Sequence, residues 1–208
     1  MSTFELERAG VAHTVARTPC AMIAAAVAAC AGFTLTAMLQ TADSSELLPF
    51  LRLDAVLLAA AATVAVDDVA ARLTVSAPVG RATQRRWSLA LVGLATAASD
   101  VAIMLVVGSA RSLDGIPVVG LTTELVGLVS FGWALAALIA AMTGSTTPSR
   151  RAAPLLIVSA LVSVTIASIS RRLWIVPGTG WSGIPTRWVA IAAVALACVA
   201  WASRDRRR

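Results

Sequence analysis

Long runs of apolar residues alternate with short polar links along the whole chain. The runs cover residues 20–40, 51–72, 87–108, 116–142, 153–170 and 187–202. Because an α-helix rises 1.5 Å per residue, about 20 apolar residues are enough to cross the hydrocarbon core of a bilayer. The runs are too long and too rich in Ala and Leu for the roughly ten-residue alternation of barrel strands. The pattern predicts an all-α, polytopic membrane bundle of six transmembrane helices, forming a single domain over residues 1–208.

The placement of arginine predicts how these helices are oriented. If six helices alternate in direction, twelve Arg residues fall on the side that holds both chain ends, and five fall on the other side. Cytoplasmic loops of membrane proteins carry an excess of basic residues. We therefore expect both chain ends in the cytoplasm, with the Arg171–Arg172 pair as the main exception to the rule.

Two segments outside the six runs also carry apolar side chains. Residues 1–18 place apolar residues at helical spacing, which favours an amphipathic helix on the inner membrane surface, with a frayed polar terminus as the alternative. Residues 171–187 are too apolar for a free loop, and their Pro and Gly residues forbid one continuous helix. Trp174 and Trp181 suit the water–lipid interface. We expect two short interfacial or re-entrant pieces between the fifth and sixth spans.

Composition supports a membrane protein and argues against other classes. The chain is 58% hydrophobic and only 13% charged, whereas soluble domains are about 25% charged. Its net charge of +6 could suggest nucleic-acid binding, but membrane-length apolar runs separate the basic clusters, so we expect no nucleic-acid partner. The basic residues are all Arg, which is typical of a high-GC genome. The expected location is a bacterial inner membrane, with lipid around the bundle.

Two acidic residues fall inside predicted spans, where charge is costly and function is the default reading. Asp100 lies thirteen residues into the run 87–108, and Glu124 lies eight residues into the run 116–142, which enters the membrane from the opposite side. Both acids are therefore expected at a similar depth below the outer surface. They could line a path for a substrate or a proton. Alternatively, each acid could hold neighbouring helices together by hydrogen bonds. The candidate hydroxyl partners are Thr96, Ser99, Thr122 and Thr123.

A further acidic pair, Asp67 and Asp68, lies near the inner end of the second span. Arg72 follows Asp68 at the favourable helical ion-pair spacing, so the pair could be an interfacial cap, or it could orient the cytoplasmic segment that follows. The same string is similar to the motif of CDP-alcohol phosphotransferases. However, Val64 stands where that family has an earlier Asp, and the family's downstream aspartates are also missing here. Without these carboxylates the string cannot hold the metal pair.

No residue set resembles an enzyme centre. His13 is the only histidine, and Cys20, Cys30 and Cys198 have no metal-ligand spacing, so we expect no metal site and no catalytic residues. The cysteines suit packing inside apolar runs. The chain contains no Lys and therefore no Walker lysine. If ATP drives a process here, ATP and Mg²⁺ bind to another subunit.

One cytoplasmic segment resembles a known family. Residues 68–87 read DVAARLTVSAPVGRATQRRW, in which an Arg, the string SAPVGR and a basic run precede the next span. This arrangement is similar to the link between the second and third spans of type-two ABC transporter permeases, in an actinobacterial-like version. In that family the link forms a coupling helix, which docks on the ATPase. The resemblance also implies six spans with both ends inside, a surface helix before the first span and re-entrant helices before the last.

The resemblance assigns ATPase coupling to residues 73–86 and the Arg before them. Pro78 breaks a helix there and Gly80 loosens it, while the arginines present positive charge from a compact inner loop. Plain positive-inside anchoring is the alternative, and it needs no partner. The candidate coupling residues are Arg72, Pro78, Gly80, Arg81, Arg85 and Arg86.

The function that the resemblance implies is a transmembrane subunit of an ABC exporter. It would bind no cofactor itself, and it would pair with a nucleotide-binding ATPase and with a second permease subunit, identical or related. The candidate substrate path comprises Asp100, Glu124, Trp174 and Trp181. Two other functions remain open: a membrane binding or immunity-type scaffold without transport, and a proton- or ion-coupled carrier that uses the two intramembrane acids.

Overall fold

A computed structural model describes residues 20–40, 47–67, 81–110, 117–166, 174 and 184–202 of the chain. Within these ranges the protein is helical apart from short connections, and they contain no strand, which confirms the predicted all-α class. The segments 1–18 and 73–80, and Trp181, lie outside the described residues. The helices are α2 (Cys20–Gln40), α3 (Leu48–Ala62) with a 3₁₀ continuation η2 (Thr63–Val66), α4 (Arg81–Ala110), α5 (Val118–Thr143), α6 (Ser149–Thr165) and α8 (Ile184–Ala202).

Within the described ranges, four helices are long and apolar enough to cross a membrane. They are Leu48–Val66, Arg86–Ser109, Val118–Thr143 and Ile184–Ala202. α6 is shorter, with 17 residues, or about 25 Å. Many large apolar side chains on these helices point outward, including Leu94, Leu105 and Val119. Apolar helices with exposed apolar faces indicate a membrane protein.

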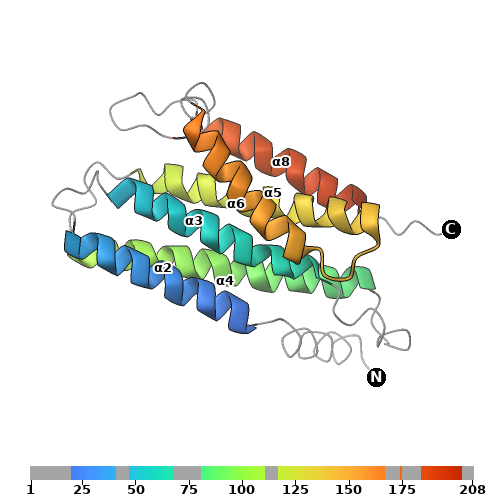
Figure 1. Ribbon diagram of the computed structural model, residues 1–208, viewed down its shortest axis with the longest axis horizontal. Coiled ribbons are helices and arrows are strands. Elements are labelled where there is room, and N and C mark those ends of the chain that lie inside the picture. The colour runs from blue at the N-terminus through green and yellow to red at the C-terminus, as the bar shows by residue number, and fades with distance from the viewer. Residues whose placement is uncertain are drawn as a thin grey trace.

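Consecutive helices of the bundle run in opposite directions (Figure 1). α2 begins, α3 ends and α4 begins toward one end of the bundle, where α5 ends, α6 begins and α8 ends as well (Figure 1). Five arginines occupy the first two turns of α4 and the first turn of α6 at this end, which we call the arginine-rich end. They are Arg81, Arg85, Arg86, Arg150 and Arg151.

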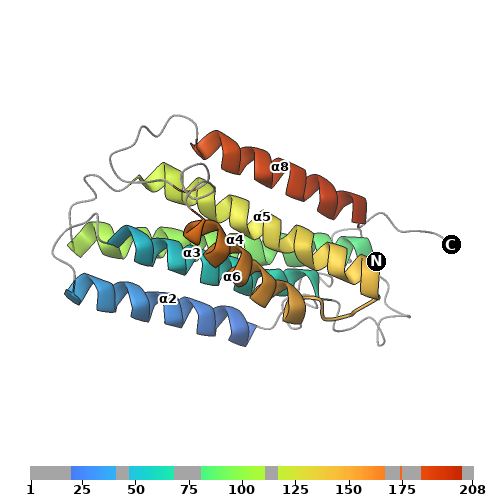
Figure 2. The ribbon, with the colours of Figure 1, turned by 45° about the horizontal axis from the view of Figure 1, so that its top comes forward.

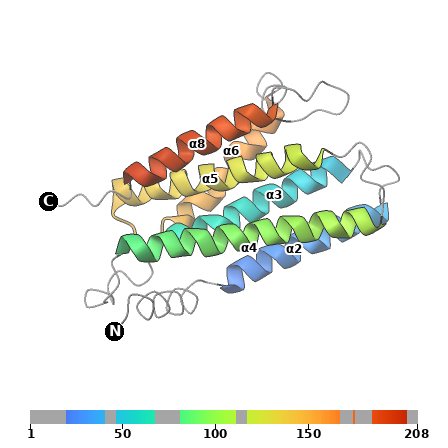
Figure 3. The same cartoon turned by 180° about the vertical axis from the view of Figure 1, so that it is seen from behind.

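Helix α5 is the centre of the packing. It contacts α8 most extensively and also packs against α3 and α6, while α2 packs on the far side of α3. Figure 2 shows this succession from α8 through α5 and α3 to α2, and Figure 3, the view from behind, shows α4 in front of α2 and α3. Glycines permit the close approach: a Cβ at Gly132 would lie 3.0 Å from Thr63 Cγ2, and one at Gly127 would overlap the ring of Trp188.

The second apolar run starts and ends earlier than predicted. The helix begins at Leu48, with Pro49 in the first turn, where its missing N–H group costs nothing. It ends at Val66, because the last turn tightens to 3₁₀ geometry and Asp67 is extended, with φ −67° and ψ 132°. The prediction of a continuous span to residue 72 is therefore wrong at Asp67.

The third helix starts earlier than predicted, at Arg81 in place of residue 87. No Gly or Pro interrupts the chain between Arg81 and Trp87, and Ala, Gln and Arg are good helix formers. Arg81, Arg85 and Arg86 therefore belong to the first two turns of α4, which corrects the prediction that they lie in a compact loop.

The last two helices are also displaced from their predicted ranges. α6 starts at Ser149, directly after Pro148, and ends at Thr165, since Ile166 is extended with ψ 103°. α8 starts at Ile184, so residues 184–187 form its first turn and are not a re-entrant piece. Of the remaining residues in the predicted 171–187 segment, the structure describes Trp174.

Candidate functional site

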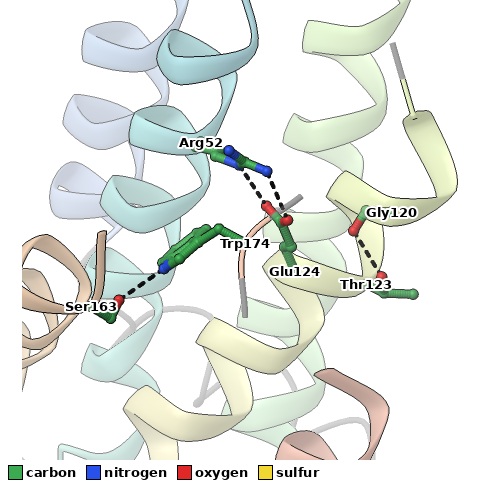
Figure 4. A network of polar contacts seen from close by, with 6 residues as sticks. All are labelled: Arg52, Gly120, Thr123, Glu124, Ser163 and Trp174. Carbon is green, nitrogen blue, oxygen red and sulfur yellow. Dashed lines mark hydrogen bonds and ion pairs between the residues drawn. The ribbon is translucent and has the colours of Figure 1, made fainter. Parts of the chain in front are cut away.

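A buried ion pair joins the early turns of α3 and α5 at the end of the bundle opposite the arginine-rich end. Arg52 donates from Nε to Oε2 of Glu124 at 3.1 Å and from Nη2 to Oε1 at 3.3 Å (Figure 4). Glu124 is fully buried, and the Arg52 side chain is 17% exposed. The planar guanidinium group thus meets both carboxylate oxygens, the two-point geometry that makes such pairs strong and directional.

Trp174 covers the guanidinium group of this ion pair. Arg52 Cζ lies 5.6 Å from the centroid of the indole ring, which is within the range of a cation–π interaction. The indole Nε1 donates a hydrogen bond to Ser163 Oγ of α6 at 2.9 Å (Figure 4). Trp174 is buried inside the bundle, where Arg52 and Ser163 supply partners for its ring face and its N–H group.

A second tryptophan packs behind the first. The rings of Trp174 and Trp188 meet edge to face, with centroids 5.4 Å apart and an interplanar angle of 67°. Trp188 in turn fills the space that Gly127 of α5 leaves open. We call this set the Arg52–Glu124 network, and it links α3, α5, α6 and α8. Its members are Arg52, Glu124, Ser163, Trp174 and Trp188.

Asp100, the other predicted intramembrane acid, lies on a different side of α5 from Glu124. It is buried on α4, and Thr122 Oγ1 donates to its Oδ2 at 3.5 Å. Thr122 and Glu124 are two positions apart on α5, so they point about 200° away from each other. The structure therefore places both acids in the interior, as expected, but it separates them.

Of the four hydroxyl groups expected as partners of these acids, the one on Thr122 reaches Asp100 at 3.5 Å, and it also lies 3.0 Å from the Val118 carbonyl oxygen of its own helix. The others donate to carbonyl oxygens of their own helices, as Ser and Thr side chains in helices often do. Thr96 donates to Val92, Ser99 to Ala95 and Thr123 to Gly120.

Asp54 is a buried acid that the sequence analysis missed. It lies on the face of α3 toward α2, where Thr34 Oγ1 donates to its Oδ2 and Cys30 Sγ lies 3.5 Å from its backbone oxygen. Asp54 is 2% exposed, and its Oδ1 has no hydrogen-bond partner in the described part of the chain. An acid inside an apolar run was the signal that identified Asp100 and Glu124, and the same signal could have found Asp54.

Asp67 ties the end of η2 to the start of α6. Its Oδ1 accepts a hydrogen bond from the Ser149 backbone N–H at 2.9 Å, and its Oδ2 accepts one from the Ser149 hydroxyl. A carboxylate at a helix N-terminus also meets the positive end of the helix dipole. Burial raises the pKa of Asp67 above its usual value, while the hydrogen bonds from Ser149 and the charge of Arg150 oppose that rise.

Sequence reasoning expected a cap near Asp67 but did not find its target, which is 82 residues away. Among the candidate coupling residues, Arg81, Arg85 and Arg86 lie at the start of α4, and the side chain of Arg86 is exposed. The proposed partners Asp68 and Arg72, like Pro78 and Gly80, lie outside the described residues. Within the described ranges no three His, Cys, Asp or Glu side chains gather closely enough to hold a metal ion.

Comparison with known proteins gave no match: neither a family model, nor a curated protein, nor a solved structure is significantly similar to this chain. The class that the fold itself defines, over the described residues, is an all-helical protein with four helices long and apolar enough to span a membrane. Its buried Arg52–Glu124 network and its three further buried or half-buried carboxylates, on Asp54, Asp67 and Asp100, are the features from which function can be argued.

Proposed function

We propose that this chain is the transmembrane subunit of an ABC-type transporter, a permease that receives ATP-driven motion from a separate ATPase subunit. The observation that carries the proposal is the pair of hydrogen bonds between Asp67 and Ser149. Asp67 is the last described residue before the 68–80 link, which leads into α4. The residue directly before the segment that resembles an ATPase-docking link is therefore joined to the first turn of α6.

Helix α6 can transmit a displacement from one end of the bundle to the other. Ser149 stands in its first turn, and Ser163 in its last turn accepts the hydrogen bond from Trp174. Trp174 covers Arg52, which is paired with Glu124. A movement of the link would thus reach the Arg52–Glu124 network through a helix about 25 Å long.

The distribution of charge supports a cytoplasmic position for the arginine-rich end. Five described arginines lie at this end, whereas Arg52 and Arg187 belong to the opposite end, and the Arg52 charge is compensated by Glu124. The positive-inside rule then directs the link toward the side where ATP is available. This orientation corresponds to six crossings of a bacterial inner membrane, with both chain ends inside.

Two permease subunits, identical or related, would enclose a substrate path at their interface. On this chain the path would use the buried polar groups near the outer end, namely Asp100, Glu124 and Trp174. Buried ionisable groups are costly within a membrane and mark pathways for ions or substrates. The direction of transport that fits the resemblance is export.

The test is a comparison of Ser149→Ala with Ser159→Ala in the purified transporter. Ser149→Ala removes the hydroxyl donor to Asp67, whereas the Ser159 hydroxyl donates to Leu156 of its own helix and has no part in the relay. We expect Ser149→Ala to lower the substrate transported per ATP hydrolysed, and Ser159→Ala to leave this ratio unchanged.

Three outcomes would reject the proposal. The first is isolation of the chain from native membranes without a nucleotide-binding subunit. The second is transport that a pH gradient drives without ATP, which would identify an ion-coupled carrier. The third is an ATPase rate that Arg81→Glu does not alter, which would identify a non-transporting scaffold.

A further inference from the structure

The interface between α2 and α3 carries a polar cluster that is separate from the Arg52–Glu124 network. Three residues form it: Cys30 and Thr34 of α2, and Asp54 of α3. All three are buried, with exposed fractions of 0%, 2% and 2% respectively. Thr34 donates to Asp54 Oδ2, and Cys30 Sγ lies within hydrogen-bond distance of the Asp54 backbone oxygen.

The cluster lies deep within two apolar helices. Asp54 comes six residues after the start of α3 and Thr34 six residues before the end of α2, so each is about 9 Å from the end of its helix. Leu51 and Leu58, three positions before and four positions after Asp54, lie on the same face of α3 and belong to the buried apolar core. An ionised carboxylate in such surroundings is strongly unfavourable unless a cation accompanies it.

No cationic side chain accompanies Asp54 among the described residues. Arg52 is two positions away on α3 and therefore points to the opposite face, where it binds Glu124. From α2, the thiol of Cys30 and the hydroxyl of Thr34 face Asp54, and neither is a cation. On the other helices that pack against α3, Asp100 accepts from Thr122, while Arg86, Arg150 and Arg151 lie at the arginine-rich end.

We propose that Asp54 is a proton-binding site in the interior of the bundle. The proton is carried on Oδ1, the oxygen without a hydrogen-bond partner in the described residues, while Thr34 holds Oδ2. A neutral carboxylic acid loses much less than a carboxylate when it leaves water. When α2 separates from α3 and water reaches the side chain, the O–H bond breaks, the proton passes to water, and Asp54 becomes a carboxylate.

The ligand set favours a proton over a metal cation. Hard cations take about six oxygen ligands. The cluster offers two carboxylate oxygens and the Thr34 hydroxyl, and one of these carboxylate oxygens already accepts a hydrogen bond. The proposal does not depend on whether ATP drives transport, because it concerns an interface that the relay from Asp67 to Trp174 does not include.

The experiment is infrared spectroscopy of the full chain in lipid nanodiscs at neutral pH, comparing wild type with Asp54→Asn. We expect the wild type to show a C=O stretching band of a protonated carboxyl group that Asp54→Asn removes. Thr34→Val should retain the band at a shifted frequency, because the carboxyl group loses its hydrogen-bond donor, and this variant tests the site even if Asp54→Asn folds poorly.

The matched control is the double variant Arg52→Met/Glu124→Gln, which removes a carboxylate together with its cation. It should leave the Asp54 band in place, because the ion pair contains no protonated carboxyl group. If wild type and Asp54→Asn have the same carboxyl spectrum, the proposal is wrong. It is also wrong if sodium chloride, but not choline chloride, raises the melting temperature of the wild type and Asp54→Asn abolishes that rise, since the site would then hold a sodium ion.

Discussion

Glu124 of α5 and Asp54 of α3 are both buried acids, and both take part in contacts of helix α3 with a neighbouring helix. Their surroundings differ. Glu124 faces Arg52 of α3 at 3.1 Å, and Trp174 covers that guanidinium group. Asp54 belongs to α3 itself and meets a hydroxyl group and a thiol from α2. One helix thus directs a cation toward α5 and an acid toward α2, because positions two residues apart point in nearly opposite directions.

The difference shows two ways in which the interior of an apolar helix bundle accommodates a carboxyl group. An ion pair keeps both charges but makes each dependent on the other, so the network at Glu124 is rigid and costly to break. An acid without a cation has to be neutral while it is buried, and it can change its charge when its surroundings open. The first arrangement suits a fixed connection between helices, and the second suits a switch.

The largest effect on stability is expected from Arg52→Met, which removes the cation that distinguishes Glu124 from Asp54. The substitution leaves the fully buried Glu124 without its cation, which costs about 3–5 kcal/mol of unfolding free energy for a typical buried pair. Denaturant unfolding in detergent micelles measures this loss. The Asp54→Asn substitution leaves no charge behind, so its cost should be much smaller.

The double variant Arg52→Met/Glu124→Gln is the control for this prediction. It should recover most of the stability that Arg52→Met loses, because no unpaired charge remains. Equal losses in the single and double variants would mean that the ion pair contributes through packing rather than charge.

A smaller effect on stability is expected from Gly127→Ala, which tests how tightly Trp188 packs behind Trp174. The new Cβ would overlap the ring of Trp188, which cannot retreat freely because it packs against Trp174. Overpacking of this kind costs about 1–3 kcal/mol, measured by the same unfolding experiment. The band assigned to Asp54 should not change, since α2 is on the far side of α3.

Gly93→Ala is the matched control for the glycine prediction. Its Cβ would lie 3.2 Å from Cη2 of Trp133, at the far end of a side chain, and Ala favours the helix by about 1 kcal/mol over Gly. It should therefore cost less than Gly127→Ala. A loss as large at Gly93 would mean that the α5–α8 contact tolerates no less strain than the rest of the bundle.

The smallest expected effect on stability is that of Asp67, a third carboxyl group. Its partners are the two hydrogen-bond donors of Ser149. Because burial raises its pKa in the folded protein, the folded state binds more protons than the unfolded state just above the usual Asp value of about 3.9. Its titration therefore adds stability below that value, and this contribution is lost as the pH rises through the raised pKa.

Melting temperatures of wild type and Asp67→Asn across the acidic range should reveal this contribution. As the pH rises, the melting temperature of the wild type should fall relative to that of Asp67→Asn. Ser149→Ala should move the change to higher pH, because the lost hydroxyl donor had lowered the pKa. A pH-independent difference would show that Asp67 acts only through its hydrogen bonds.

The sequence was sufficient to predict the helices, because a membrane-length apolar run has few other solutions. Each of the six predicted runs corresponds to a helix of the structure. The ends were less predictable, since they depend on local capping and on distant contacts. The second helix ends at Val66 partly because Asp67 binds Ser149. A local sequence pattern cannot predict a partner that is 82 residues away.

The same limitation explains the errors in the candidate site. Glu124 and Asp100 were recognisable as acids within apolar runs, but the partner of Glu124 was not. Arg52 was one of the five arginines counted on the side opposite the chain ends, whereas a long flexible side chain near a helix start can equally reach into the bundle. Residue type alone did not reveal the burial of Trp174, because that burial depends on groups from three other elements.

The position of Trp174 gives the protein a built-in optical reporter. Its indole ring contacts a guanidinium group and a second indole, so its fluorescence responds to the electric field and the hydration at the end of the bundle opposite the arginine-rich end. Any rearrangement that draws α3 away from α8 changes both. Because the chain has six tryptophans, the signal of Trp174 is the difference between the fluorescence of the wild type and that of Trp174→Phe, and this difference can be followed in real time.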